Sequence, residues 1–206
     1  MDLQTVFPRS PFSLNDRIMH YGRTHGLISW AIEIPIVSRC LPVSMPTCII
    51  FHSYSGITRG IAEKIEKACG GRLIEVVPRK AYNKLTVYLA GGRRAMKEEA
   101  DPVDPERIDV AACDLLVIGT PVWAGNPTPV INGAIAGLAN CEGKSAVLFA
   151  TCGVQAGKTL EVMTRALETK GVVVKASIVF SRKEIGDEKN VQELVDAVKT
   201  AQAAGP

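Results

Sequence analysis

The sequence is most constrained at residues 47–61, where a short apolar run, a turn of small residues and a helical pattern follow one another. The apolar run, residues 48–51, is typical of a strand buried on both faces of a parallel sheet. The turn, residues 53–58, is rich in hydroxyl groups, and apolar residues recur at helical spacing from Thr58 onward. This order predicts a strand that leads through a short loop into a helix.

The loop between this strand and helix has the features of an anion site. The first amides of a helix have no intrahelical partner and lie at the positive end of the helix dipole. Ser53, Ser55 and Thr58 add hydroxyl donors, and Gly56 allows the backbone to turn without a Cβ clash. The loop has no lysine, which a triphosphate site usually contains. A phosphate monoester is therefore the expected ligand, and a turn whose hydroxyls only cap the helix is the alternative.

Apolar runs alternate with helical patterns through the rest of the chain. The later strands are predicted at residues 73–77, 114–119, 145–150 and 172–180, and the helices at 58–69, 85–99, 129–138, 158–170 and 187–203. The second helix is expected to break near Gly91 and Gly92. This alternation predicts an α/β domain with a parallel sheet and right-handed crossovers. Ligands of such sheets bind at the carboxyl ends of the strands, so the loops after the first, third and fourth strands should meet.

The two later loops also carry unusual residues. Trp123 lies between two prolines in the loop of residues 120–127, and an exposed indole there indicates a flat ligand. Packing of Trp123 on the neighbouring helix is the alternative. The loop of residues 151–157 is similar to a Walker A motif, but only three residues separate Gly153 from Gly157, where four are required. We therefore expect its backbone to line a site rather than to hold a triphosphate.

Together, the three loops resemble those of the flavodoxin family. Residues 53–58 look like its phosphate-binding loop, residues 119–127 look like its first flavin-ring loop, and residues 151–157 fall where its second ring loop lies. The resemblance covers residues 45–203. It implies an α/β, flavodoxin-like three-layer fold with a five-stranded parallel sheet in the order 2-1-3-4-5, and FMN as the cofactor.

The resemblance also implies roles for individual residues. Ser53, Ser55 and Thr58 would hold the phosphate, and Trp123 would stack on the isoalloxazine ring. The peptide that meets flavin N5 would come from Ala124 and Gly125, while the third loop would approach the pyrimidine end of the ring. No catalytic side chain and no metal ligand is implied. The implied cofactor-binding residues are Ser53, Tyr54, Ser55, Gly56, Ile57, Thr58, Thr120, Pro121, Val122, Trp123, Ala124, Gly125, Asn126, Thr151, Cys152, Gly153 and Gly157.

The function that this resemblance implies is electron transfer at low potential between redox partner proteins. An FMN-dependent NAD(P)H or quinone oxidoreductase on the same fold is the alternative, and it would need a second open pocket beside the flavin. A flavin-free interaction module is a third possibility. The chain departs from many family members in two ways: its third loop has no aromatic residue, and its net charge is +3 rather than strongly negative. We expect no nucleic-acid or membrane partner, and a monomer or weak dimer.

The remaining sequence features concern the N-terminus and the cysteines. Residues 1–44 have five prolines in or just after them and no sustained period, which indicates a poorly ordered extension before a domain of residues 45–206. Met45 is a candidate natural start. None of the six cysteines forms a C-x-x-C pair, so buried, reduced thiols in a cytoplasmic protein are expected.

Overall fold

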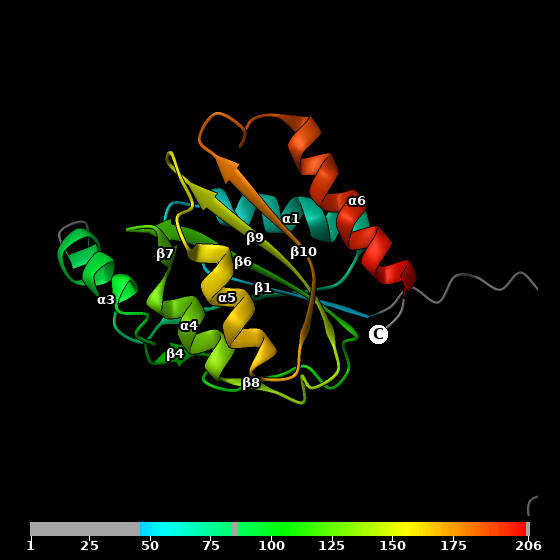
Figure 1. Ribbon diagram of the computed structural model, residues 1–206, viewed down its shortest axis with the longest axis horizontal. Helices are drawn as coiled ribbons and strands as arrows, with labels where there is room; N and C mark the ends of the chain where they lie inside the picture. The colour runs from blue at the N-terminus through cyan, green and yellow to red at the C-terminus, as the bar shows by residue number, and fades with distance from the viewer. Residues whose placement is uncertain (1–45, 84–85, 205–206) are drawn as a thin grey trace, which may run out of the picture. The chain divides into compact units, whose positions relative to one another are not determined.

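The computed structural model describes residues 46–83 and 86–204 (Figure 1), without the side chains of residues 88 and 89. The predicted extension of residues 1–44 and the candidate start at Met45 lie outside the described residues.

The centre of the fold is a parallel sheet, which the sequence predicted. Its strands run in the order β2, β1, β6, β9, β10, which is the expected order 2-1-3-4-5. Every residue of β1 and β9 is buried, as continuous apolar runs require. The strands are β1 (Thr47–Phe51), β2 (Arg72–Glu75), β6 (Leu115–Trp123), β9 (Ser145–Cys152) and β10 (Val173–Ser181).

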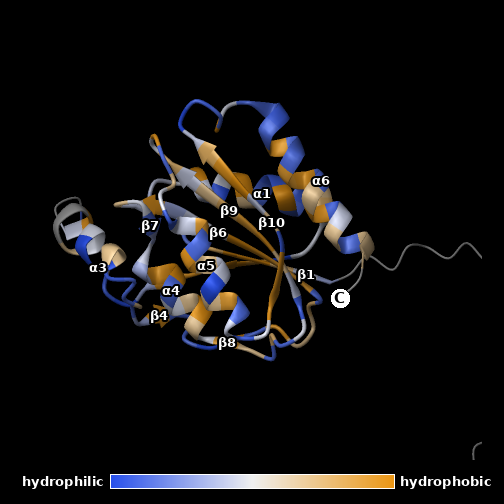
Figure 2. Cartoon of the chain, in the orientation of Figure 1, coloured by the Kyte–Doolittle hydropathy of each residue, from blue (hydrophilic) through white to orange (hydrophobic). Residues whose placement is uncertain are grey.

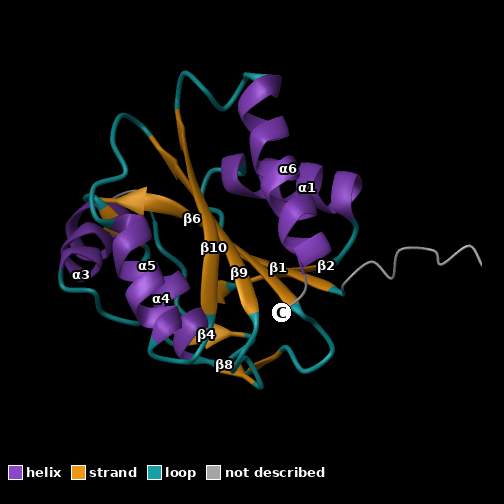
Figure 3. Cartoon of the chain, turned by 45° about the vertical axis from the view of Figure 1, so that its right-hand side comes forward, coloured by secondary structure: helices purple, strands orange, loops and turns teal. Residues whose placement is uncertain are grey.

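Helices cover both faces of this sheet, which gives three layers (Figure 3). The helices α1 (Ile57–Cys69) and α6 (Glu188–Ala204) pack on one face, and α4 (Pro129–Ala136) and α5 (Thr159–Glu168) pack on the other. Alternate residues of each strand point to opposite layers, so two apolar cores form, one under each pair of helices. Figure 2 shows the apolar strands enclosed between helices that are hydrophilic on their outer sides.

Shorter elements extend the edge of the domain. The strand β3 (Val77–Pro78) pairs antiparallel with β4 (Val103–Asp104), and β5 (Ile108–Asp109) pairs with β8 (Leu138–Ala139). Between β3 and β4 lie the π-helix η1 (Val87–Gly91) and the helix α3 (Gly92–Met96).

The predicted break at Gly91 and Gly92 was wrong. Both glycines are right-handed helical, so η1 continues directly into α3. A glycine is needed at position 91 for packing, because a Cβ there would lie 2.7 Å from Cζ3 of Trp123. Leu85, the expected first residue of this helix, lies outside the described residues.

The expectation of reduced cysteines was wrong for one pair, since Cys48 and Cys113 form a disulfide. Their Cα atoms are 5.8 Å apart because β1 pairs with β6, and Cys113 lies just before β6. The two cysteines are 65 positions apart in the sequence, so the cysteine spacing could not show this proximity. Cys69, Cys141 and Cys152 are free thiols, and Cys40 lies outside the described part.

Candidate functional site

The three loops that the sequence predicted to meet do meet at the carboxyl ends of β1, β6 and β9. The hydroxyl oxygens of Thr58 and Thr151 are 2.9 Å apart and hydrogen-bonded, although the two residues are 93 positions apart in the sequence. The amide of Lys158 donates to the carbonyl oxygen of Gly125 over 2.7 Å. A cavity of 280 Å³ opens among these loops, and its lining residues are Ser55, Ile57, Pro121, Val122, Thr151, Cys152, Gly153, Arg182 and Ile185.

The first loop keeps the hydrogen-bond donors that an anion needs. Gly56 adopts a φ of 86°, and its amide donates to the hydroxyl of Ser53, 3.1 Å away. Ser53 accepts in that bond and therefore keeps its own proton to donate. No side chain caps α1, and its first turn has no acidic residue. The amides at the start of α1 therefore remain available to a ligand.

The second loop is more ordered than the sequence predicted. Residues 120–127 were expected to form a loop, but β6 extends to Trp123 and turns directly into β7 (Asn126–Pro127). The turn residues Ala124 and Gly125 have φ values of 49° and 75°, as a type I′ hairpin turn requires. The side-chain amide of Asn126 donates to the carbonyl of Ala124 over 3.1 Å, which holds that peptide in place.

Thr120 does not line the cavity, so its predicted contact with a cofactor stays a prediction. Its side chain is fully buried, and its hydroxyl accepts a hydrogen bond from the amide of Thr128 at 3.3 Å. The two threonine hydroxyls are also 3.4 Å apart. Because Thr128 is the N-cap of α4, Thr120 fixes the start of that helix.

The expected exposure of Trp123 was also wrong, since only 9% of its surface is accessible. It packs with Val87 and Ala95 of the η1–α3 segment, which was the alternative that the sequence left open. The rings of Tyr82, Tyr54 and His52 meet it edge-on, with centroids at 5.1, 6.0 and 6.1 Å respectively. Whether Trp123 also stacks on a flavin ring stays a prediction.

The third loop contributes side chains and a close backbone contact. Thr151 and Cys152 are buried at the cavity, and burial raises the pKa of the Cys152 thiol, with Glu184 acting in the same direction. Gly157 has a φ of 57°, and a Cβ there would lie 2.4 Å from the carbonyl oxygen of Gly125. A glycine at this position therefore allows the second and third loops to touch.

Sequence reasoning missed two residues of the cavity, Arg182 and Ile185. Both lie in the loop that follows β10, the fifth strand. The rule that ligands lie at the carboxyl ends of the strands could have found them. Arg182 is the only cationic residue of this cavity lining, and it forms no ion pair within the described part of the chain.

Sequence reasoning also missed His52, whose ring has an unusual environment. Its Nδ1 lies 3.0 Å from the carbonyl oxygen of Val76, while its Nε2 is buried and has no partner among the described residues. Burial lowers the pKa of His52, so the ring is neutral near pH 7. With its proton on Nδ1, the ring presents Nε2 as an unused acceptor beside Trp123.

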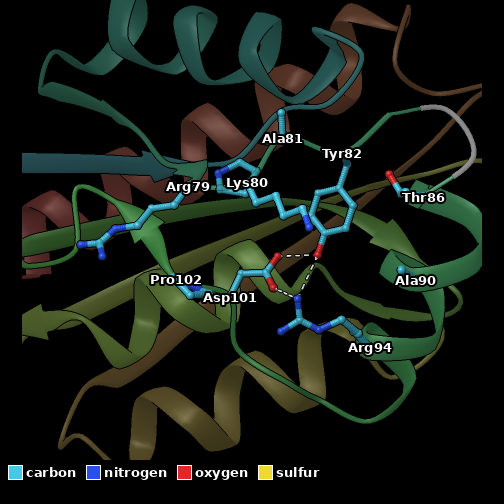
Figure 4. A pocket seen from close by; sticks show the side chains of 10 residues that line it. Arg79, Lys80, Ala81, Tyr82, Thr86, Ala90, Arg94, Asp101 and Pro102 are labelled. Atoms are coloured by element: carbon cyan, nitrogen blue, oxygen red, sulfur yellow. Dashed lines mark hydrogen bonds and ion pairs between the residues drawn. The ribbon is translucent and has the colours of Figure 1, made fainter.

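A second cavity, of 430 Å³, lies between β3, the η1–α3 segment and β4 (Figure 4). On one wall, the hydroxyl of Tyr82 donates to Asp101 over 2.5 Å, and Arg94 forms an ion pair with the same carboxylate. Burial and the bond to Asp101 raise the pKa of Tyr82 to about 12, so the phenol stays protonated at neutral pH. Arg94 of α3 thus points toward Asp101 and Tyr82.

No metal-binding group of histidine, cysteine and acidic residues occurs in residues 46–83 and 86–204. In the same part of the chain, no helix is both long and apolar enough to cross a membrane.

A comparison with protein families finds a match to a flavodoxin family model over residues 47–193. Three solved structures are similar in fold. A protein from Bacteroides uniformis has a TM-score of 0.63 and 19% identity, with 74% of this chain and 99% of that chain covered. A protein from Bacteroides eggerthii has a TM-score of 0.61 and 24% identity, with 75% and 98% covered. A flavoprotein from Lactobacillus acidophilus, solved in complex with FMN, has a TM-score of 0.58 and 22% identity, with 73% and 98% covered. No curated protein matches the chain.

Proposed function

Because the chain belongs to the flavodoxin family, we propose that it binds FMN and carries low-potential electrons between redox partner proteins. The observation that carries this proposal is the meeting of the three loops around one cavity. The Thr58–Thr151 hydrogen bond ties the first loop to the third, and the bond from Lys158 to Gly125 ties the third to the second. Such a site at the carboxyl ends of the strands is where doubly wound sheets bind flavin mononucleotide.

The donors at the first loop fit the phosphate of FMN. The hydroxyl groups of Ser53 and Ser55 and the uncapped amides of α1 offer hydrogen bonds without a lysine. The hydroxyl of Thr58 is buried and pairs with Thr151, so its contact with the phosphate stays a prediction. Arg182 adds the positive charge that this loop lacks, because it lines the same cavity as Ser55 and Ile57. We therefore assign Arg182 to the phosphate end of the site.

The residues toward the ring end fit a flat apolar group. Pro121 and Val122 of β6 and Cys152 and Gly153 of the third loop line the cavity, and none of them carries a charge. The fold is similar to that of the Lactobacillus acidophilus flavoprotein solved with FMN, which supports this choice of cofactor. Contacts from Trp123, Ala124 and Gly125 to the ring stay predictions.

When bound, FMN supplies the redox chemistry, so no catalytic acid or base is needed from the protein. The protein's own residues bind, orient and exclude water. The hydroxyls and amides of the first loop hold the phosphate, and Pro121 and Val122 keep water from the ring end. Because burial raises the pKa of Cys152, its thiol stays neutral and adds no negative charge beside the ring.

The cofactor is tested by purifying the full chain, recording its visible spectrum and separating the heat-released cofactor by chromatography. FMN is the expected product, because the donor set suits a single phosphate monoester. Release of FAD, or failure of the apoprotein to bind added FMN, would contradict the proposal.

One observation favours the second candidate function, an FMN-dependent NAD(P)H or quinone oxidoreductase. That function needs a second open pocket, and the cavity beside Tyr82 is one, since Tyr82 contacts Trp123. Stopped-flow mixing with NADPH separates the two functions: rapid flavin reduction supports the oxidoreductase, and slow reduction supports the electron carrier. A cytoplasmic location, redox proteins as partners and a monomer or weak dimer remain predictions.

A further inference from the structure

The cavity beside Tyr82 is separate from the cavity proposed for FMN. The two cavities share no lining residue. The second cavity is also the larger, with a volume of 430 Å³, which is within the range of small-molecule sites. Its lining residues are Pro78, Arg79, Lys80, Ala81, Tyr82, Thr86, Ala90, Arg94, Asp101 and Pro102.

Hydrogen bonds hold the walls of this cavity in place without a ligand. The amide of Arg79 donates to the carbonyl oxygen of Pro102 over 2.9 Å, next to the β3–β4 pair. Arg94 is bound to Glu99, to Asp101 and to the carbonyl oxygen of Ala100, so α3 is fastened to the start of β4. Because these side chains are already held in place, ordering them on ligand binding costs little free energy.

The lining of this cavity has an excess of positive charge. It contains three cations and one carboxylate, and that carboxylate, Asp101, is already paired with Arg94 and Tyr82. Arg79 forms an ion pair with Glu106 and points away from Tyr82 (Figure 4). Lys80 instead reaches across the cavity toward Tyr82, and its ammonium pairs with no carboxylate among the described residues. Lys80 is therefore the cation that a ligand can use.

Apart from these charged residues and Thr86, the lining is apolar and suits a flat ring. Tyr82 offers its half-buried ring, and Pro78, Pro102, Ala81 and Ala90 also line the cavity. An aromatic ring gains most when it packs against another ring and against aliphatic groups in such a cavity.

We propose that this cavity binds a small aromatic carboxylate, with its ring against Tyr82 and its carboxylate on the ammonium of Lys80. The proposal rests on the lining residues alone and does not require that FMN binds. Because Tyr82 meets Trp123 edge-on at 5.1 Å, only the Tyr82 ring would separate such a ligand from Trp123 of the second loop.

The test is a titration of the isotope-labelled full chain with 2-naphthoate, followed by amide chemical shifts in two-dimensional NMR spectra. A ligand of this size is expected to bind with a Kd of about 1 mM. The uncharged 2-naphthamide, which has the same shape, is expected to bind about three- to fivefold more weakly because it cannot pair with the ammonium. Lys80→Gln is expected to remove this difference between the two probes.

Two further variants show whether the probes occupy this cavity. Ala90→Phe fills the cavity and is expected to abolish binding of both probes. Met96→Phe is the control, because it places the same ring on an exposed position of α3 outside the lining, and it should leave both affinities unchanged. The amide spectrum of each variant reports whether it is folded. Equal affinity of the two probes for the unmodified protein, or unchanged binding in Ala90→Phe, would overturn the proposal.

The same titration with FMN present separates this inference from the proposed function. Unchanged naphthoate affinity at saturating FMN supports two distinct sites, whereas displacement of naphthoate by FMN would place it in the cofactor cavity and overturn the inference. If FMN does not bind at all, the proposed function fails, but the naphthoate results for Lys80→Gln and Ala90→Phe still decide the inference.

Discussion

Replacing Arg182 by Gln should weaken the binding of FMN much more than the binding of riboflavin. Arg182 is the only cationic residue of the cavity that also contains Ser55 and Ile57 of the phosphate loop. Riboflavin has the same ring and ribityl chain but no phosphate, so it cannot use the guanidinium. Gln keeps much of the length and polarity of Arg and removes the charge.

The size of this effect follows from the exposure of Arg182, which lies at the open side of the cavity. A solvent-exposed ion pair contributes up to about 1 kcal/mol, because water and salt screen the two charges. We therefore expect FMN affinity to fall about fivefold and riboflavin affinity to change less than about twofold. The loss for FMN should shrink as the salt concentration rises.

The assay is a fluorescence titration of the apoprotein with FMN and, separately, with riboflavin. Lys183→Gln is the matched control, because it removes the same charge from the next residue, which does not line the cavity. It should leave the FMN-to-riboflavin affinity ratio unchanged. If Arg182→Gln leaves that ratio unchanged while the unmodified protein prefers FMN, the assignment of Arg182 to the phosphate is refuted and FMN binding itself is not.

Three further predictions concern the loops and their surroundings. Gly157→Ala should lower the free energy of unfolding by about 2–4 kcal/mol in denaturant titrations, because its Cβ would lie 2.4 Å from the carbonyl oxygen of Gly125 and its φ is 57°. Trp123→Ala should lower it by about 3–5 kcal/mol and weaken FMN binding at least about tenfold, since a buried indole leaves a cavity and any stacking is lost. Tyr82→Phe should lower it by about 1–2 kcal/mol near pH 7, because the buried carboxylate of Asp101 loses a donor. The pKa of Tyr82 is raised to about 12, so the contribution of its protonated phenol to the free energy of unfolding is fully present below pH 10 and is lost toward pH 12. Tyr82→Phe should therefore reduce the fall in the free energy of unfolding between these two pH values.

Controls separate these effects from general damage. Gly60→Ala, in the first turn of α1 with nothing within 4 Å of its Cβ, should stabilise the protein by about 0.4–1 kcal/mol. Equal losses for Gly60→Ala and Gly157→Ala would contradict the packing argument. Trp123→Phe keeps an aromatic ring and should retain most of the stability. Unchanged FMN affinity in both Trp123 variants would make Trp123 a packing residue only.

The residue patterns by themselves determined the alternation of strands and helices and the place of the site, whereas the strand order came from the resemblance to the flavodoxin family. A continuous apolar run such as the one in β9 indicates a strand that is buried on both faces. Apolar residues at helical spacing indicate a helix with one buried face. Both patterns can be recognised from residues that are close together in the sequence. Their alternation requires crossovers that put all carboxyl ends on one edge, which is why Ser55 and Thr151 could be assigned to one site in advance.

Only the tertiary structure decided which side chains at that edge are available. Thr120 turned out to hold the start of α4, and Trp123 is covered by η1 and α3, because both positions depend on segments that pack beside them. The disulfide between Cys48 and Cys113 likewise follows from strand pairing across 65 residues. Burial and proximity of this kind arise from contacts between distant segments, and no local pattern of residues records them.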